Sequence, residues 1–269
     1  MTGGTALPDV QRVDVGAVEM YVEITGHGPD LVLLHGGGGT IDDLGALRTL
    51  LSANHRVVAP EQRGHGRTGD PGDISYPAMA ADTAALLDAL AVERADLVGW
   101  SDGAVIALLV ARDRPDLVGS VVSIGGNVDA TPPATPAFTE STSAWLASAT
   151  PADVPMPPLY RDPREGPAHW PLVAARVLEM WRHDPGLSLD DLSRLSCPVL
   201  FVSGDRDMIE LDHTLAMYRA AASAALAIVP HAGHHVPATH VALVAELTEQ
   251  FLSHPPPDSP AVEGTQPGG

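Results

Sequence analysis

The pentapeptide Gly99–Gly103, with the sequence Gly-Trp-Ser-Asp-Gly, places Ser101 between an apolar run and the helix-like stretch Ala104–Arg112. A sharp turn from a strand into a helix strains its central residue and brings neighbouring chain segments close, and glycine leaves room for that approach. The turn also presents the Ser101 hydroxyl at the N-terminus of the helix, where backbone N–H groups favour a developing negative charge. This pattern indicates a nucleophilic serine.

Two later loops, each directly after a predicted strand, supply carboxylates and imidazoles. The candidate acids and bases in these loops are Asp205, Asp207, His231, His234 and His235. A serine hydroxyl is a weak nucleophile at its own pKa, so it needs an adjacent histidine to accept its proton and a carboxylate to fix that histidine's tautomer. The loops therefore predict a Ser-His-Asp triad, and the residue types alone leave open which acid and which base belong to it.

A run of glycines, Gly36–Gly39, follows His35 and the apolar run Leu31–Leu34. Consecutive glycines after a strand let backbone N–H groups point into a site without obstruction by side chains, which suits an oxyanion hole. We predict that the N–H groups of Gly37 and Asp102 form this hole. The alternative is a flexible turn in which the glycines merely permit positive φ.

Short apolar runs alternate with segments of helical period, which is the pattern of parallel strands joined by crossover helices. Helices are expected over Tyr76–Leu90 and Val241–Leu252, each of which carries one apolar stripe. Nearly uninterrupted apolar runs are typical of strands that are buried on both faces. The predicted strands are Met20–Ile24, Leu31–Leu34, Arg56–Ala59, Ala95–Gly99, Ser120–Ile124, Val199–Ser203 and Ala225–Val229.

This regularity breaks over residues 128–196, where proline is dense and three of the four tryptophans lie. The stretch is too long for a plain loop, and its aromatic residues imply packing. We predict a small helical cap inserted over the carboxyl ends of the strands, while residues 9–127 and 197–253 form one α/β core. Residues 1–8 and the proline-rich residues 254–269 are expected to be disordered tails.

Over roughly Val13–Leu252 the sequence resembles the α/β-hydrolase fold superfamily, in which the triad residues follow in the chain order Ser, Asp, His. The turn Arg63–Thr68 after a predicted strand is part of the resemblance. Within the superfamily, Gly99–Gly103 and the stretch Pro115–Val118 leading into Ile124–Asn127 are similar to the valacyclovir hydrolase (biphenyl-hydrolase-like) group. The resemblance implies a mostly parallel sheet of the eight-stranded type with helices on both faces, and a small helical cap inserted before the acid-bearing strand.

The same resemblance assigns catalytic roles. It implies that Ser101 is the nucleophile, that Asp207 is the orienting acid through the family's Gly-x-x-Asp pattern, and that His234 is the base through its Gly-His pattern. The alternatives that remain open are Asp205 as the acid and His231 or His235 as the base.

Asp102 departs from the pattern of a generic esterase. Its backbone N–H can serve the oxyanion hole whatever the side chain is, so its carboxylate is free for another role. In the valacyclovir hydrolase group the matching aspartate receives the α-ammonium of an aminoacyl ester, and a carboxylate beside the nucleophile would hold that ammonium by a charge-assisted hydrogen bond. The alternative role is to stabilise the helix N-terminus through its dipole. The other predicted substrate-binding residues are Trp100, Gly38, Trp145, Trp170 and Trp181. The three cap tryptophans could instead form the cap's own small core.

The resemblance and these residues predict a serine hydrolase that cleaves a small carboxylic ester, with α-aminoacyl esters among the candidates, and that needs no cofactor or metal. The same triad in related chains serves lactonases, cofactor-free haloperoxidases and carbon–carbon bond hydrolases, so these activities remain alternatives. A small-molecule receptor without activity is the alternative from a different class. A zinc site in the histidine-rich loop is disfavoured, because the His-Glu-x-x-His motif is missing.

The composition excludes several other classes. The chain has 15 Lys+Arg against 34 Asp+Glu, and every one of the 15 is arginine, so there is no lysine for a Schiff base or a phosphate loop. A net charge of −19 disfavours binding to nucleic acid or to an anionic membrane. With no visible signal peptide or membrane span, we expect a soluble cytoplasmic protein, a monomer or homodimer, whose partner is a small-molecule ester.

Three further residues are expected to have structural roles. His35 and His65 are interpreted as hydrogen-bonding residues that take no part in the chemistry. Cys197 is the single cysteine and is expected to be a packed, inert thiol.

Overall fold

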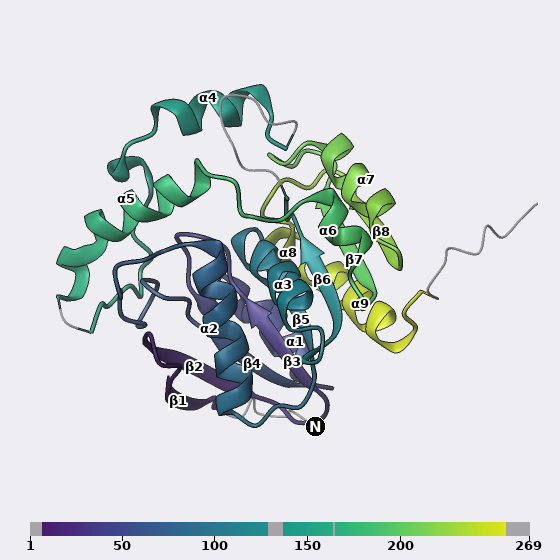
Figure 1. The fold of residues 1–269 in the computed structure, drawn as a ribbon, viewed down its shortest axis with the longest axis horizontal. Coiled ribbons are helices and arrows are strands. Elements are labelled where there is room, and N and C mark those ends of the chain that lie inside the picture. The colour runs from purple at the N-terminus through teal and green to yellow at the C-terminus, as the bar shows by residue number, and fades with distance from the viewer. Residues whose placement is uncertain (1–6, 129–136, 164, 257–269) are drawn as a thin grey trace, which may run out of the picture.

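The computed structural model describes residues 7–128, 137–163 and 165–256, so the predicted tails lie mostly outside the described residues. The core is an eight-stranded sheet in the order β1-β2-β4-β3-β5-β6-β7-β8 (Figure 1). The pairs β1–β2 and β2–β4 are antiparallel, and all pairs from β4 through β8 are parallel, which confirms the predicted sheet. The strands are β1 (Asp9–Asp14), β2 (Glu19–Thr25), β3 (Asp30–Leu34), β4 (Arg56–Pro60), β5 (Ala95–Trp100), β6 (Val118–Ile124), β7 (Val199–Gly204) and β8 (Ala224–Val229).

The edge strand β1 is absent from the sequence prediction, which found the other strands of this sheet to within about two residues. No residue of β1 is buried, because the strand pairs on one side only and both its faces are accessible. A strand of this kind has no reason to carry an apolar run, which is the signal that revealed the other strands.

Helices cover both faces of the sheet (Figure 1). α2 and α3 pack against each other on one face, and α1 and α9 pack against each other on the opposite face. The helices are α1 (Gly45–Leu51), α2 (Tyr76–Ala89), α3 (Asp102–Asp113), α4 (Glu140–Ser148), α5 (Trp170–Trp181), α6 (Leu189–Ser193), α7 (Leu211–Ala220), α8 (Val236–Thr239) and α9 (Val241–Ser253), with 3₁₀ turns η1 (Ile41–Leu44), η2 (Pro151–Asp153) and η3 (Gly166–His169).

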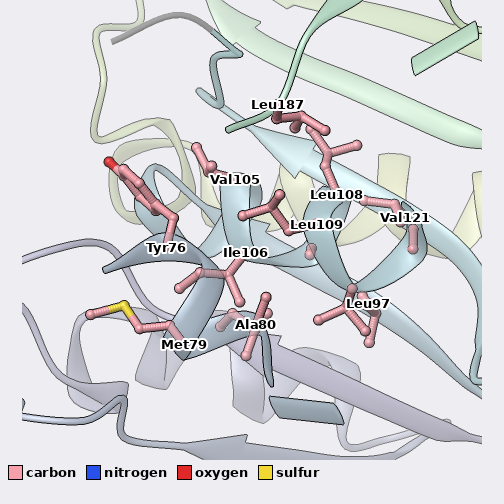
Figure 2. Packing of buried hydrophobic residues seen from close by; sticks show 14 of the residues in the cluster. Tyr76, Met79, Ala80, Leu97, Val105, Ile106, Leu108, Leu109, Val121 and Leu187 are labelled. Carbon is pink, nitrogen blue, oxygen red and sulfur yellow. The ribbon is translucent and has the colours of Figure 1, made fainter. Parts of the chain in front are cut away.

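Successive residues of the central strands point to opposite faces of the sheet, so each face has its own apolar core. Leu97 of β5 and Val121 of β6 pack with α2 and α3. Figure 2 shows both side chains in one cluster with labelled residues of these two helices. Their neighbours Val98 and Val122 belong to the core on the face of α1 and α9. Burial on both faces explains the consecutive apolar residues Leu97–Val98 and Val121–Val122 in these strands.

The described part of the segment between β6 and β7 contains α4, α5 and α6. α4 lies at the top of Figure 1 and α5 at the upper left. The rings of Trp145 and Trp181 connect the two helices, with centroids 6.2 Å apart. α6 packs against α3 and α7 instead, so the chain has returned to the core before β7 begins. That α4 and α5 act as a cap over the site remains a prediction.

Cys197 lies just before β7 and is 4% exposed. Burial raises the pKa of its thiol to about 11, which disfavours the reactive thiolate. Among the residues that the structure describes, no helix is long and apolar enough to cross a membrane.

Candidate active site

The turn from β5 into α3, called the elbow below, holds Ser101 in a strained conformation, with φ 55° and ψ −120°. A side chain at Gly99 would collide with the carbonyl of Gly103, and one at Gly103 would collide with the carbonyl of Leu34. The Ser101 N–H donates to the Ile124 carbonyl of β6 at 2.9 Å, which ties the turn to the next strand. The residues around Ser101 therefore permit and hold a conformation that a serine rarely adopts.

Ser101, His234 and Asp207 lie in one continuous hydrogen-bonded row, although they come from three separate loops. The Nε2 atom of His234 lies 2.8 Å from the Ser101 Oγ, and its Nδ1 atom lies 2.7 Å from the Asp207 Oδ1. An Nδ1–H that donates to the carboxylate leaves Nε2 free to accept the serine proton. This is the geometry that a serine nucleophile with its base and orienting acid requires.

Asp207 and His234 are each fixed by neighbours of their own. The Asp207 carboxylate also accepts the N–H of Ile209 at 3.0 Å, and the Ser203 hydroxyl lies 3.5 Å away at the end of β7. The Trp100 indole N–H donates to the His234 carbonyl at 2.8 Å, which joins the elbow to the loop after β8. The side chain of Asp207 is fully buried, whereas that of His234 is 13% exposed.

The alternative acid and bases are not part of this hydrogen-bonded row, although His235 lines the same cavity as Ser101 and His234. Asp205 is exposed, and its backbone N–H pairs with Val229. The Nδ1 atom of His231 accepts a hydrogen bond from the Arg206 guanidinium at 3.0 Å, and His235 packs against the Trp100 ring. In the described part of the chain, no group of three or more His, Cys, Asp and Glu side chains is arranged to hold a metal ion.

The glycine loop after β3 forms a tight turn beside the elbow. The N–H of Gly39 donates to the Gly36 carbonyl at 3.2 Å, and Gly38 has φ 69°. The N–H of Gly38 donates to Nε2 of His65 at 3.0 Å. Among the described residues, the N–H groups of Gly37 and Asp102 have no hydrogen-bond acceptor, so both are available to an oxyanion.

The side chain of Asp102 is buried and accepts two hydrogen bonds. Its Oδ1 accepts the Tyr76 hydroxyl at 2.9 Å, and its Oδ2 accepts the Trp181 indole N–H at 2.8 Å. Burial raises the pKa of Asp102, since the charged form loses water, while the two hydrogen bonds act in the opposite direction. Any side chain at Gly37 would collide with the Asp102 carboxylate, so the glycine loop packs directly on it.

A cavity of about 170 Å³ lies at Ser101 and His234. The predicted substrate-binding residues Trp100, Asp102, Trp145 and Trp181 line it. Further walls of the cavity, which the sequence reasoning did not identify, come from Tyr76, Asn127, Phe138, Leu146, Met208 and Ile209. Most of these carry no sequence signal beyond apolarity, because only the fold brings α2, α4 and the loop after β7 to one place.

Two predicted substrate-binding residues, Trp170 and Gly38, do not line this cavity. Trp170 is buried at the start of α5, where its indole N–H donates to the Val154 carbonyl at 3.1 Å and its ring packs against Tyr160. It therefore belongs to the internal core of the segment between β6 and β7. Gly38 lines a neighbouring cavity, and its N–H is already bonded to His65.

The comparisons with known proteins agree with this fold. Residues 31–247 match the family model described as Alpha/beta hydrolase family. The chain belongs to the alpha/beta hydrolase family.

Individual relatives cover different shares of the chain. The human serine hydrolase BPHL is 28% identical over 261 residues, which are 90% of this chain and 85% of that protein, and it confirms the resemblance to the biphenyl-hydrolase-like group. A pyrrolizixenacetamide deacetylase of Xenorhabdus hominickii is 36% identical over 118 residues, so the chain spans only 44% of that protein's length.

Among solved structures, E-2-(acetamidomethylene)succinate hydrolase is similar with a TM-score of 0.74 and 23% identity. The match covers 91% of this chain and 99% of that one. At this identity the likeness shows the fold.

Proposed function

We propose that the protein is a serine hydrolase that cleaves a small carboxylic ester through an acyl-enzyme intermediate. The observation that carries the proposal is the row Ser101–His234–Asp207, with both hydrogen bonds shorter than 3 Å and a strained serine at the wall of a cavity. Membership of the alpha/beta hydrolase family supports it. Fold alone would not, because the same fold serves many reactions.

In the proposed reaction His234 accepts the Ser101 proton at Nε2 while the serine oxygen attacks the ester carbonyl. Asp207 stabilises the imidazolium that forms, and the N–H groups of Gly37 and Asp102 bind the oxyanion. His234 then donates its proton to the leaving alcohol, and the C–O bond breaks. A water molecule that His234 activates in the same way releases the acid and restores Ser101.

The walls of the cavity favour a small acyl group with a polar or cationic substituent. Its apolar walls include Phe138, Leu146 and Ile209, whereas Asp102 supplies a carboxylate beside the nucleophile. Neither donor to that carboxylate carries a positive charge, so burial of the charge is poorly compensated within the protein. A substrate ammonium would compensate it, and we therefore include α-aminoacyl esters in the proposal.

A rate panel tests the proposed activity. Purified protein is assayed with p-nitrophenyl acyl esters, α-aminoacyl esters, lactones and carbon–carbon bond substrates, alongside Ser101→Ala. We expect ester turnover that falls by at least about 10⁴-fold in Ser101→Ala, with an unchanged circular dichroism spectrum. Turnover that survives in Ser101→Ala would refute the proposed nucleophile.

A fluorophosphonate probe separates the hydrolase from a receptor without activity. We expect covalent labelling of Ser101 in the folded wild type and none in Ser101→Ala, read by mass spectrometry of the modified peptide. A folded wild type that the probe does not label would favour the receptor.

A further inference from the structure

The oxyanion loop has few means of holding its own shape. It consists of the four glycines Gly36–Gly39, which lack side chains and have the largest backbone freedom of any residue. Within the loop, the structure shows one backbone hydrogen bond, from the N–H of Gly39 to the carbonyl of Gly36. A loop that must present the Gly37 N–H to an oxyanion therefore needs a constraint from outside itself.

His65 supplies such a constraint from the turn after β4. Its Nε2 accepts the N–H of Gly38 at 3.0 Å, and its Nδ1 lies 3.0 Å from the carbonyl of Arg63. A carbonyl can only accept and an amide N–H can only donate, so the imidazole must be neutral with its proton on Nδ1. Burial favours this state and lowers the pKa of His65 to about 3.

His35, directly before the glycine loop, also connects this loop to the turn after β4. Its Nδ1 donates to the Gly36 carbonyl at 2.8 Å, and its Nε2 accepts the N–H of Gln62 at 3.1 Å. The two rings lie 5.3 Å apart, and each is 1% exposed. Two neutral imidazoles of the same tautomer thus join the glycine loop to residues 62–65.

We propose that His65 is a positioning residue that holds the Gly36–Gly39 turn in the conformation that binds the oxyanion, with His35, the residue before the turn, as its counterpart. The inference rests on the proposed function, since it assigns the loop its oxyanion. Through the Gly38 N–H, His65 fixes the peptide next to Gly37. It touches neither Ser101 nor the cavity.

Two substitutions of His65 separate the two hydrogen bonds. His65→Gln can place an oxygen near the former Nε2 and accept the Gly38 N–H, whereas His65→Asn is too short to reach Gly38 but can still donate to Arg63. We expect His65→Asn to lower kcat on a p-nitrophenyl ester by about 10–100-fold with little change in KM, because an oxyanion donor is displaced rather than ground-state binding lost. His65→Gln is expected to restore most of the activity.

A tetrahedral inhibitor provides a second readout. Affinity for a trifluoromethyl ketone, which forms an oxyanion on the serine, should fall in His65→Asn in parallel with kcat. His55→Asn is the matched control. His55, directly before β4, is also buried, but its side chain hydrogen-bonds Glu249 and not the glycine loop. If His65→Asn keeps the wild-type kcat, or if His55→Asn loses kcat equally, the positioning role is refuted.

Hydrogen exchange of the Gly38 amide tests the constraint without any turnover. We expect exchange at Gly38 at least tenfold faster in His65→Asn than in the wild type or His65→Gln, measured by NMR. If the wild type hydrolyses no ester, the proposed function fails while this measurement still decides whether His65 holds the loop. Unchanged exchange in His65→Asn would refute the constraint itself.

Discussion

Two buried carboxylates lie within the same site but are built into it differently. Asp207 follows β7 and faces His234, a side chain that can become positively charged, while it also accepts a backbone N–H. Asp102 begins α3 and faces the Tyr76 hydroxyl and the Trp181 indole, both of which donate but stay neutral. The comparison supports the proposals that Asp207 stabilises an imidazolium during the reaction and that Asp102 binds a substrate cation.

The two carboxylates also differ in what they connect. Asp207 joins two loops at the carboxyl edge of the core sheet, the loops after β7 and β8. Asp102 joins α2 of the core to α5 beyond it, through Tyr76 and Trp181. A change at Asp207 should therefore alter the chemistry, and a change at Asp102 should alter selectivity and stability.

Asp207→Asn is expected to have the largest effect. The amide cannot stabilise an imidazolium and can fix the wrong histidine tautomer, so kcat on a neutral ester should fall by about 10⁴-fold. Steady-state kinetics on p-nitrophenyl acetate measure this, with Asp205→Asn as the matched control because Asp205 is exposed. A loss in Asp205→Asn that exceeds the loss in Asp207→Asn would reverse the assignment of the acid.

Asp102→Asn should affect substrates according to their charge. The loss of a charge-assisted hydrogen bond to an ammonium is expected to lower kcat/KM for α-aminoacyl esters by about 10–100-fold. Neutral esters of the same size should change by less than about threefold, because the Asp102 N–H is unaltered. Equal effects on both substrate classes would rule out the ammonium pocket.

The contrast also explains which parts of the site the sequence could reveal. The elbow, the glycine loop and the acid and base loops each follow a strand directly, so local patterns predicted them. The partners of Asp102 come from distant helices, and nothing in the chain near Asp102 points to Tyr76 or Trp181. Trp170 and Trp181 are the first and last residues of one helix, α5, and composition alone cannot tell which of them faces the cavity.

Those two tryptophans offer a matched pair of substitutions. Trp181→Phe removes one donor from the Asp102 carboxylate, so the preference for α-aminoacyl over neutral esters should rise about threefold to tenfold. Trp170→Phe should leave that preference unchanged and lower the free energy of unfolding by about 1–3 kcal/mol, because it leaves the buried Val154 carbonyl without its donor. Competition assays and urea denaturation measure the two effects. If Trp170→Phe changes the preference and Trp181→Phe does not, the cavity walls are wrongly assigned.

The smallest expected effect is a pH-dependent gain of stability in Asp102→Asn. In the unfolded chain an aspartate titrates near pH 3.9, and burial raises the pKa of Asp102 in the folded state above its ordinary value. The folded state then binds the Asp102 proton more tightly than the unfolded state. The contribution of Asp102 to the free energy of unfolding therefore falls as the pH rises from the unfolded pKa to the folded pKa. Asparagine does not ionise, so its contribution to stability does not fall with pH. It can keep both contacts, because its oxygen can accept the Trp181 N–H and its amide N–H can donate to the Tyr76 hydroxyl.

Urea denaturation of both proteins from pH 3.5 to pH 8 measures that difference. We expect the two to be equally stable near pH 3.5, and Asp102→Asn to be more stable by about 1 kcal/mol at pH 8. Asp207→Asn should be less stable than the wild type at pH 8, because the Asp207 carboxylate accepts hydrogen bonds from His234 and Ile209 that an amide can only partly replace. If Asp102→Asn were instead the less stable protein at pH 8, its charge would already be compensated within the fold and no substrate cation would be needed.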